Sequence, residues 1–163
     1  MLRVLPVMFA GCIIPPSLGV EQQDAGVNSP PSIISVRSDQ TELPEPGPID
    51  IAVGQTSPLN LTLLDTDIND KLYVRIFVNY SVTPAFRSSC TAAGTGQATR
   101  TATCALQGVC LSQDIATNPN LLQVMVFDRQ PLEGGELPLY QAMPPGGLST
   151  DRTYSLNCRN MSP

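Results

Sequence analysis

Short runs in which apolar and polar side chains alternate constrain the fold of this chain more than any other feature. Within residues 59–63 the odd positions are leucine, and within residues 72–80 the even positions are apolar. An alternation with a period of two buries one face of a β-strand and exposes the other. Sixteen prolines and twelve glycines are spread along the chain, which disfavours long helices. The sequence therefore predicts an all-β fold.

Strand-like runs continue along the rest of the chain. They are short, rich in β-branched and apolar residues, and bounded by turn-forming residues, at 33–37, 49–54, 99–104, 121–128 and 154–158. About seven such strands are typical of an antiparallel β-sandwich, so we expect one domain over residues 32–163. Tyr73 and Phe77 lie on the second face of the 72–80 strand, which predicts that this face is partly covered. The proline-rich stretch 42–48 is expected to be a loop.

The composition argues against several kinds of function. The net charge is −5 and Lys71 is the single lysine, so we expect no basic patch and no nucleic-acid partner. Histidine is absent, which removes a common general base and metal ligand. Nucleophilic catalysis would then depend on Lys71 or on paired carboxylates, and no pair stands out in the sequence. We therefore expect no catalysis, with a secreted carboxylate-dependent enzyme as an alternative.

The first twelve residues have the order of a bacterial export signal. Arg3 precedes a short apolar run, and small residues then lead to Cys12. The stretch Phe9-Ala10-Gly11-Cys12 resembles the lipobox of bacterial lipoproteins. That resemblance implies a signal peptide over residues 1–11 and a Cys12 that carries diacylglycerol and a further acyl chain such as palmitate. Two or three acyl chains hold a soluble domain on a bilayer durably, whereas a single chain does not.

Residues 12–31 are expected to tether the domain to the membrane. They contain several prolines and polar residues and show no period, which is typical of a flexible linker. Ile13, and not aspartate, would be the second residue after cleavage, which in lipoproteins of Gram-negative bacteria implies release to the outer membrane. The periplasmic and the cell-surface side both remain open. The alternative interpretation is an uncleaved apolar tail with an unmodified cysteine.

The cysteine count supports export independently. A lipid on Cys12 would leave four of the five cysteines, at Cys90, Cys104, Cys110 and Cys158. Four cysteines in an exported chain are typical of two disulfides, because the periplasm and the cell surface are oxidising. A zinc site formed by all four thiolates is the alternative, although no Cys-x-x-Cys spacing is present.

The order of the strands resembles that of immunoglobulin-like and fibronectin-like domains. The apolar strand ending at Asp128, the excursion rich in Pro and Gly, and the closing strand are similar to the last two strands of such domains. Residues 59–65 and 72–80, with an acidic loop between them, resemble their central hairpin. The chain after Ser32 is thus similar to immunoglobulin-like lipoproteins of Gram-negative bacteria, a resemblance that specifies fold better than function. The core tryptophan and the central-strand cysteines of antibody domains are absent.

The positions of the cysteines suggest how they pair. Cys90 and Cys104 are symmetric about the turn 94–97, so a local hairpin would bring them together. Cys110 lies in the loop that enters the strand beside the one ending at Cys158, and these strands run in opposite directions. Of the three possible pairings we therefore predict Cys90–Cys104 and Cys110–Cys158, with a structural role.

The densest group of carboxylates lies in residues 65–70. Oxygen ligands of the kind that calcium prefers are offered by Asp65, Asp67, Asn69 and Asp70. The stretch is not an EF-hand, because Asp70 stands where that motif requires glycine. The alternative is a turn in which these side chains accept backbone hydrogen bonds. The sequence is thus compatible with no cofactor, or with calcium that stiffens an adhesion-type module.

Residues 129–148 form a long loop with no strand pattern, and such loops in compact domains are commonly functional. Two interpretations are open: a contact surface for an envelope protein, or a loop folded back over the end of the sandwich. The apolar residues concerned are Leu132, Leu137, Leu139, Tyr140 and Met143. Together these patterns predict a lipid-anchored outer-membrane lipoprotein whose β-sandwich is a structural or protein-binding module of the cell envelope.

Overall fold

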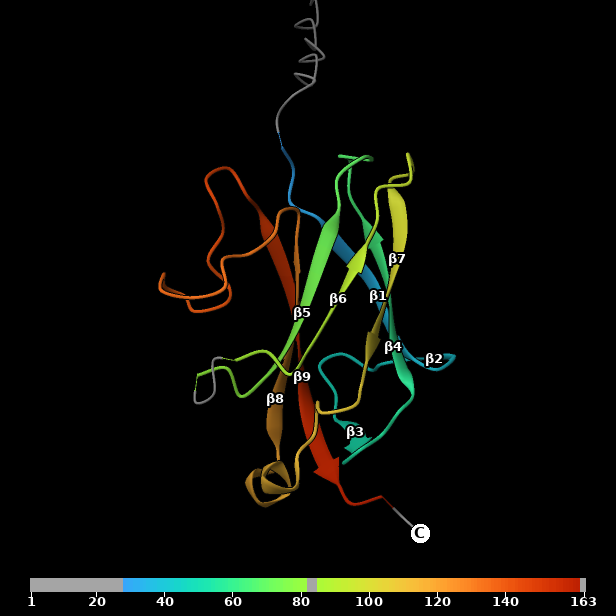
Figure 1. Cartoon of the computed structure of the whole chain (residues 1–163). Coiled ribbons are helices and arrows are strands. Elements are labelled where there is room, and N and C mark those ends of the chain that lie inside the picture. The colour runs from blue at the N-terminus through green and yellow to red at the C-terminus, as the bar shows by residue number, and fades with distance from the viewer. Residues whose placement is uncertain (1–27, 82–84, 162–163) are drawn as a thin grey trace, which may run out of the picture.

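The computed structural model describes residues 28–81 and 85–161, which form two β-sheets packed face to face (Figure 1). The four-stranded sheet has the order β2 (Thr41–Glu42), β1 (Ser32–Ser38), β4 (Pro58–Leu64) and β7 (Thr99–Ala105). The five-stranded sheet has the order β3 (Ile49–Ala52), β9 (Ser149–Arg159), β8 (Asn120–Phe127), β5 (Leu72–Val78) and β6 (Ser88–Ala92). A short 3-10 helix, η1 (Ser112–Thr117), precedes β8. The predicted all-β sandwich is confirmed.

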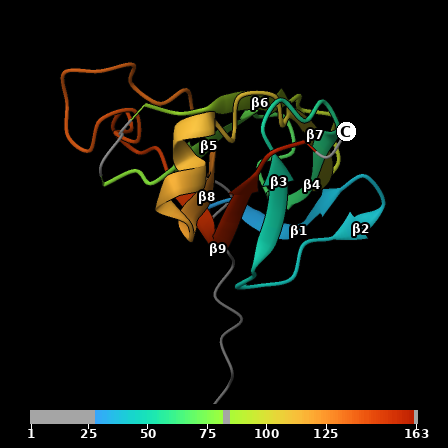
Figure 2. The ribbon, with the colours of Figure 1, turned by 90° about the horizontal axis from the view of Figure 1, so that it is seen from below.

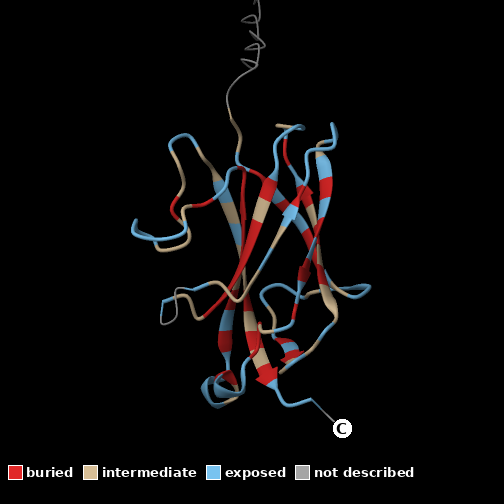
Figure 3. Ribbon diagram, viewed as in Figure 1, coloured by how far each residue is buried: buried red, intermediate tan, exposed pale blue. Residues whose placement is uncertain are grey.

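The alternation of the sequence builds the core between the two sheets. In β4, the side chains of Leu59, Leu61 and Leu63 are buried and the residues between them are not. The facing strands bury Val74, Ile76, Val124, Val126, Tyr154 and Leu156 against them. Figure 3 shows these buried positions as bands along the strands. Each buried aliphatic side chain contributes about 1.5–3 kcal/mol to folding, so this layer supplies most of the driving force.

The stretch predicted to resemble a central hairpin is a crossing between the sheets, which corrects that prediction. β4 pairs with β1 and β7, whereas β5 pairs with β6 and β8. The loop 65–70 therefore carries the chain from one sheet to the other. The prediction failed because alternation shows which residues a strand buries but does not show which strand it pairs with. The chain thus places β1, β4 and β7 in one sheet and β5, β8 and β9 in the other.

The described residues contain nine strands, where the sequence predicted about seven. β6 was missed because its Ser88, Ser89 and Thr91 give no apolar alternation. β2 is a two-residue strand, Thr41–Glu42, that ends at the first residue of the predicted loop. β9 begins at Ser149 and not at residue 154, since it pairs along this length with β8. Edge pairing and polar extensions of this kind leave no hydrophobic signal in a sequence.

Candidate protein-binding surface

Part of what the sequence predicted lies outside the described residues. The signal peptide over residues 1–11, Cys12 and the tether up to residue 27 belong to that part. The described chain begins at Asn28, whose side-chain amide donates hydrogen bonds to the carboxylate of Asp128 and, at 2.8 Å, to the carbonyl of Gly146. The described chain thus starts against the base of the 129–148 loop. Within residues 28–81 and 85–161, no helix is long and apolar enough to cross a membrane.

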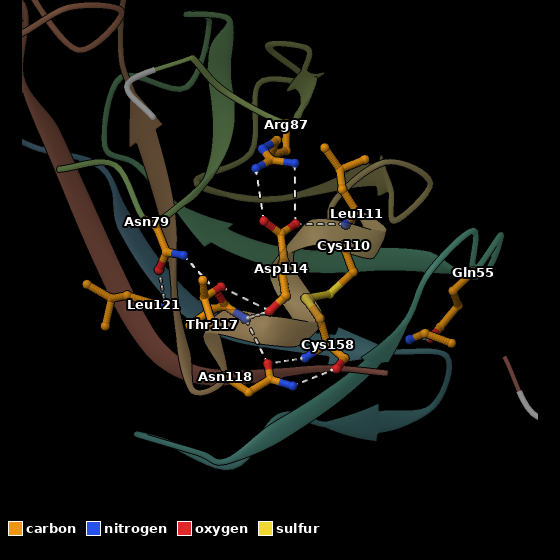
Figure 4. Close-up of a disulfide and its surroundings, with 12 residues drawn as sticks. Gln55, Asn79, Arg87, Cys110, Leu111, Asp114, Thr117, Asn118, Leu121 and Cys158 are labelled. Atoms are coloured by element: carbon orange, nitrogen blue, oxygen red, sulfur yellow. Dashed lines mark hydrogen bonds and ion pairs between the residues drawn. A yellow bond between two sulfur atoms is a disulfide. The ribbon is translucent and has the colours of Figure 1, made fainter. Parts of the chain in front are cut away.

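Both predicted disulfides are present, which confirms the pairing. Cys90–Cys104 joins β6 to β7, the edge strands of opposite sheets, so a sheet crossing replaces the hairpin expected there. Cys110–Cys158 joins the segment before η1 to β9, and both of its cysteines are buried (Figure 4). Because all four sulfurs are in disulfides, the four-thiolate zinc alternative is not formed. The two bridges close one side and one end of the sandwich.

The end of the sandwich around the second bridge is fully engaged in internal contacts. Asn118 donates to the carbonyl of Cys158 at 2.7 Å and accepts from its amide at 2.9 Å (Figure 4). The buried carboxylate of Asp114 pairs with Arg87 at 3.3 Å and accepts from the amide of Leu111 at 2.7 Å. Buried polar groups that are satisfied in this way hold a structure together and offer little to a ligand. This end is structural.

The acidic loop is organised around a buried arginine. The side chains of Asp65 and Arg100 are 0% and 1% exposed, and Asp65 Oδ2 lies 3.0 Å from the Arg100 guanidinium. Asp65 Oδ1 accepts from the amide of Asp67 at 3.1 Å. The same guanidinium donates to the carbonyls of Asp67, at 3.1 Å, and of Asp70. Burial raises the pKa of Asp65 above its usual 3.8, against the opposing effect of the Arg100 charge.

The four residues predicted as calcium ligands do not converge as side chains on one point. Asp65 is committed to Arg100, Asp67 is half-buried, and Asn69 and Asp70 are exposed. Within the part of the chain that the structure describes, no group of three or more acidic or cysteine side chains is placed to hold a metal ion. The guanidinium of Arg100 already donates hydrogen bonds to the carbonyls of Asp67 and Asp70 in this loop. The turn interpretation accounts for what is seen, and calcium binding stays a prediction from the sequence.

The 129–148 loop lies over the outer face of the five-stranded sheet, on the side away from the other sheet (Figures 1 and 2). Beneath it, a second apolar cluster contains the buried Phe77, Met125 and Phe127. Tyr140 and Met143 from the loop pack against this cluster. The prediction that the second face of the 72–80 strand is covered is therefore confirmed, and the loop folds back over a sheet face and not over the end of the sandwich.

Arg75 holds both limbs of this loop. Its side chain projects from β5 and is 6% exposed, and it donates to the carbonyl of Tyr140 at 2.5 Å. Longer contacts, at 3.4 Å, reach the carbonyls of Pro131 and Leu132 on the other limb. Its remaining partner is the carboxylate of Glu133 at 2.7 Å, which is 67% exposed. Some carbonyls of the loop accept from its own amides, as Ala142 does from Leu132 at 2.9 Å. The guanidinium, with five N–H groups, satisfies the carbonyls of Tyr140, Pro131 and Leu132.

Aromatic side chains also contact the loop and the arginine that binds it. The guanidinium of Arg75 lies 4.8 Å from the ring centre of Phe86, and Phe86 meets Tyr140 edge to face at 5.8 Å. Tyr80 packs on Phe77 at 5.1 Å and donates its hydroxyl to the carbonyl of Leu139 at 2.7 Å. Burial raises the pKa of Tyr80 above 10.0, so this hydroxyl keeps its proton at neutral pH. These contacts attach the loop to the sheet at Leu139 and Tyr140.

At the tip of the loop an open apolar hollow of about 540 Å³ is lined by Tyr80, Ser81, Leu137, Pro138 and Leu139. Leu137 is 83% exposed, more than any other large apolar side chain in the described part of the chain. An exposed leucine beside an apolar hollow, on a loop fixed from below, is a feature of protein contact surfaces. We call Leu137, Pro138, Leu139, Tyr80 and Ser81 the loop-tip surface.

The five residues predicted for partner binding fall into two groups. Leu137 and Leu139 lie at the loop-tip surface, whereas Tyr140 and Met143 pack inward and Leu132 is half-buried. Sequence reasoning missed Arg75, Tyr80 and Phe86. The signal for Arg75 was present, because it stands between Tyr73 and Phe77 on the covered face of β5. A lone cation between two covered aromatics indicates a partner that brings carbonyls or a carboxylate.

Three buried aspartates have side-chain or backbone partners, whereas the buried Oδ2 of Asp67 accepts no hydrogen bond from the described residues. Asp128 accepts from the amide of Leu148 at 2.8 Å and from Asn28, while Asp65 and Asp114 are paired with arginines. Comparison of the chain with protein-family models, with curated proteins and with solved structures gives no match. The function must therefore be argued from the loop-tip surface and from the sequence.

Proposed function

We propose that this chain is a lipoprotein anchored to the outer membrane through Cys12, whose β-sandwich binds another protein of the cell envelope and has no catalytic activity. The observation that carries the binding role is the loop-tip surface, where Leu137 is 83% exposed beside an apolar hollow. Exposing a large apolar side chain in water is unfavourable, and a loop pinned by Arg75 and Phe86 cannot withdraw it. A partner that covers it would relieve this cost.

The cysteine count supports the anchor. Two disulfides use Cys90, Cys104, Cys110 and Cys158, so Cys12 is the one cysteine of five outside them. Disulfides form in oxidising compartments, which agrees with export by a signal peptide. The absence of histidine and the engagement of the buried carboxylates support a role without catalysis.

Intact mass spectrometry of the membrane-extracted protein, with and without reduction, tests the anchor. The expected mass is that of a chain beginning at Cys12 with acyl groups attached, and reduction of its two disulfides should add about four hydrogens. A mass that begins at Met1 without acyl groups would show that the anchor is wrong.

Photo-crosslinking in cells tests the binding role. A photoreactive amino acid replaces Leu137 in one variant and Leu121, which is 52% exposed on β8, in a matched control. We expect one discrete adduct from position 137 that Leu139→Asp abolishes, and no such adduct from position 121. Equal adducts from both positions, or none from either, would contradict a binding surface at the loop tip.

A further inference from the structure

We infer that the loop-tip surface binds an apolar protein segment flanked by lysine or arginine. This inference rests on the proposed function and names the class of partner for the same surface. Its basis is the distribution of charge around the hollow, together with the shape and rigidity of the loop that carries it.

The lining of the hollow contains no charged residue, and the charges that precede it along the loop are negative. Glu136 is exposed and adjoins Leu137 in the chain, whereas the charge of Glu133 is compensated by Arg75 at 2.7 Å. The nearest loop cation in sequence, Arg129, donates to the carbonyl of Pro145 at 3.2 Å, on the opposite limb. The apolar tip is therefore preceded directly by one unpaired carboxylate, Glu136, among the described residues.

The size of the hollow suits a segment of chain more than one side chain. A volume of about 540 Å³ falls within the range of about 300–1,000 Å³ typical of ligand sites. The hollow is open, and two of its lining residues carry hydroxyls: Ser81, and Tyr80, whose hydroxyl donates to the carbonyl of Leu139. Apolar side chains of a partner would fill it, and a basic side chain of the same partner would pair with Glu136, which sets orientation and association rate.

Preorganisation strengthens the inference. Arg75, Phe86 and Tyr80 fix both limbs of the loop without reaching its outermost residue, Leu137. The loop therefore loses little conformational entropy when a partner binds. This leaves more of the binding free energy to order an extended segment of the partner that is not itself folded. A net charge of −5 on the whole chain acts in the same direction, because it attracts basic partners at a distance.

Two synthetic peptides test this inference on the full chain in nanodiscs of uncharged lipid. Both contain the apolar core Leu-Pro-Phe-Leu, flanked by lysines in one and by glutamates in the other. We expect the lysine peptide to bind about two- to five-fold more tightly at low salt, because an exposed ion pair adds only modestly to affinity. High salt should remove this difference. Leu137→Asp should abolish binding, and Glu136→Gln should narrow the difference between peptides, whereas Glu42→Gln on β2 should not.

The outcomes separate this inference from the proposed function. Three results would contradict binding of a segment flanked by lysine or arginine. They are equal binding of the two peptides, binding that survives Leu137→Asp, and no binding of either peptide. If the peptides give one of these results but the photo-crosslinked adduct from position 137 still forms in cells, the proposed protein-binding function stands and only the basic character of the partner is wrong. An adduct mapped to residues 13–20 of the same chain, or to a second copy of the chain, would assign the surface to a different occupant and overturn the inference.

Discussion

Two loops of this protein are each built on a buried arginine, and they differ in the partner of that arginine. In the 65–70 loop, Arg100 holds two carbonyls and the carboxylate of Asp65, which is 0% exposed. In the 129–148 loop, Arg75 holds carbonyls from both limbs and the carboxylate of Glu133, which is 67% exposed. Both arginines donate hydrogen bonds to loop carbonyls and so satisfy backbone groups that a neighbouring strand would satisfy in a sheet.

The exposure of the carboxylate decides what each loop can do. A buried ion pair that loses one member leaves a charge without compensation, so the 65–70 loop is fixed to the sandwich. It is packed further by Gly94, where a Cβ would clash with the backbone of Asn69. In the Arg75–Glu133 pair only the carboxylate lies in solvent, where screening weakens the attraction, and Leu137 at the tip of the same loop is 83% exposed. One loop is therefore fixed by a buried ion pair, and the other carries the surface that we propose binds a partner.

Removing the buried carboxylate should have the largest effect. Asp65→Ala leaves Arg100 without its counter-charge and the amide of Asp67 without an acceptor, so we expect the free energy of unfolding to fall by about 3–5 kcal/mol. Urea denaturation followed by circular dichroism measures this. The matched variant Glu133→Ala should lose no more than about 1 kcal/mol. Equal decreases in the free energy of unfolding of the two variants would show that exposure of the carboxylate does not distinguish the two loops.

Removing the second arginine should loosen its loop more than the sandwich. Arg75→Ala leaves the carbonyls of Tyr140, Pro131 and Leu132 without this donor, and we expect a loss of about 1–3 kcal/mol. Hydrogen exchange should show faster exchange at the amide of Ala142 and unchanged protection in β4. If the β4 amides lose protection equally, the loop is part of the global folding unit and not a separate one.

The pH dependence of the free energy of unfolding tests the raised pKa of Asp65. Because burial raises its pKa in the folded state above 3.8, the folded protein holds this proton more tightly than the unfolded chain does. The stability that this group contributes is therefore greatest below pH 3.8 and falls as pH rises through the folded pKa. The neutral variant Asp65→Asn should cost less than Asp65→Ala and should lack this fall. Stability curves of wild type and Asp65→Asn that stay parallel from pH 3 to pH 7 would contradict the raised pKa.

Calcium should have the smallest effect. The guanidinium of Arg100 already binds the carbonyls of Asp67 and Asp70, so a divalent ion would meet a positive charge at the site. We expect the melting temperature to be the same in excess calcium and in excess chelator. A calcium-dependent rise that Asp67→Asn abolishes would restore the adhesion-type interpretation and would make both loops ligand sites.

Much of the sandwich could be predicted because alternation and turn residues are local signals. The leucines of β4 and the even positions of β5 appear in the sequence as buried faces, and the structure buries them. The crossing at residues 65–70 and the strand β6 could not be predicted in this way. A crossing and a hairpin have the same alternation, and Ser88–Ala92 becomes a strand only because β5 offers it an edge.

By itself, the sequence determined the export signal pattern, the all-β class, the buried faces and an even set of four cysteines after Cys12, because each is encoded by neighbouring residues or by a count. Tertiary structure alone decided that Arg100 pairs with Asp65 beneath the acidic loop, and that Arg75 and Phe86 contact a second loop with Leu137 at its tip. These contacts join residues that are tens of positions apart. Which carbonyl an arginine reaches, and whether its carboxylate stays in water, depends on how the two sheets bring distant loops together.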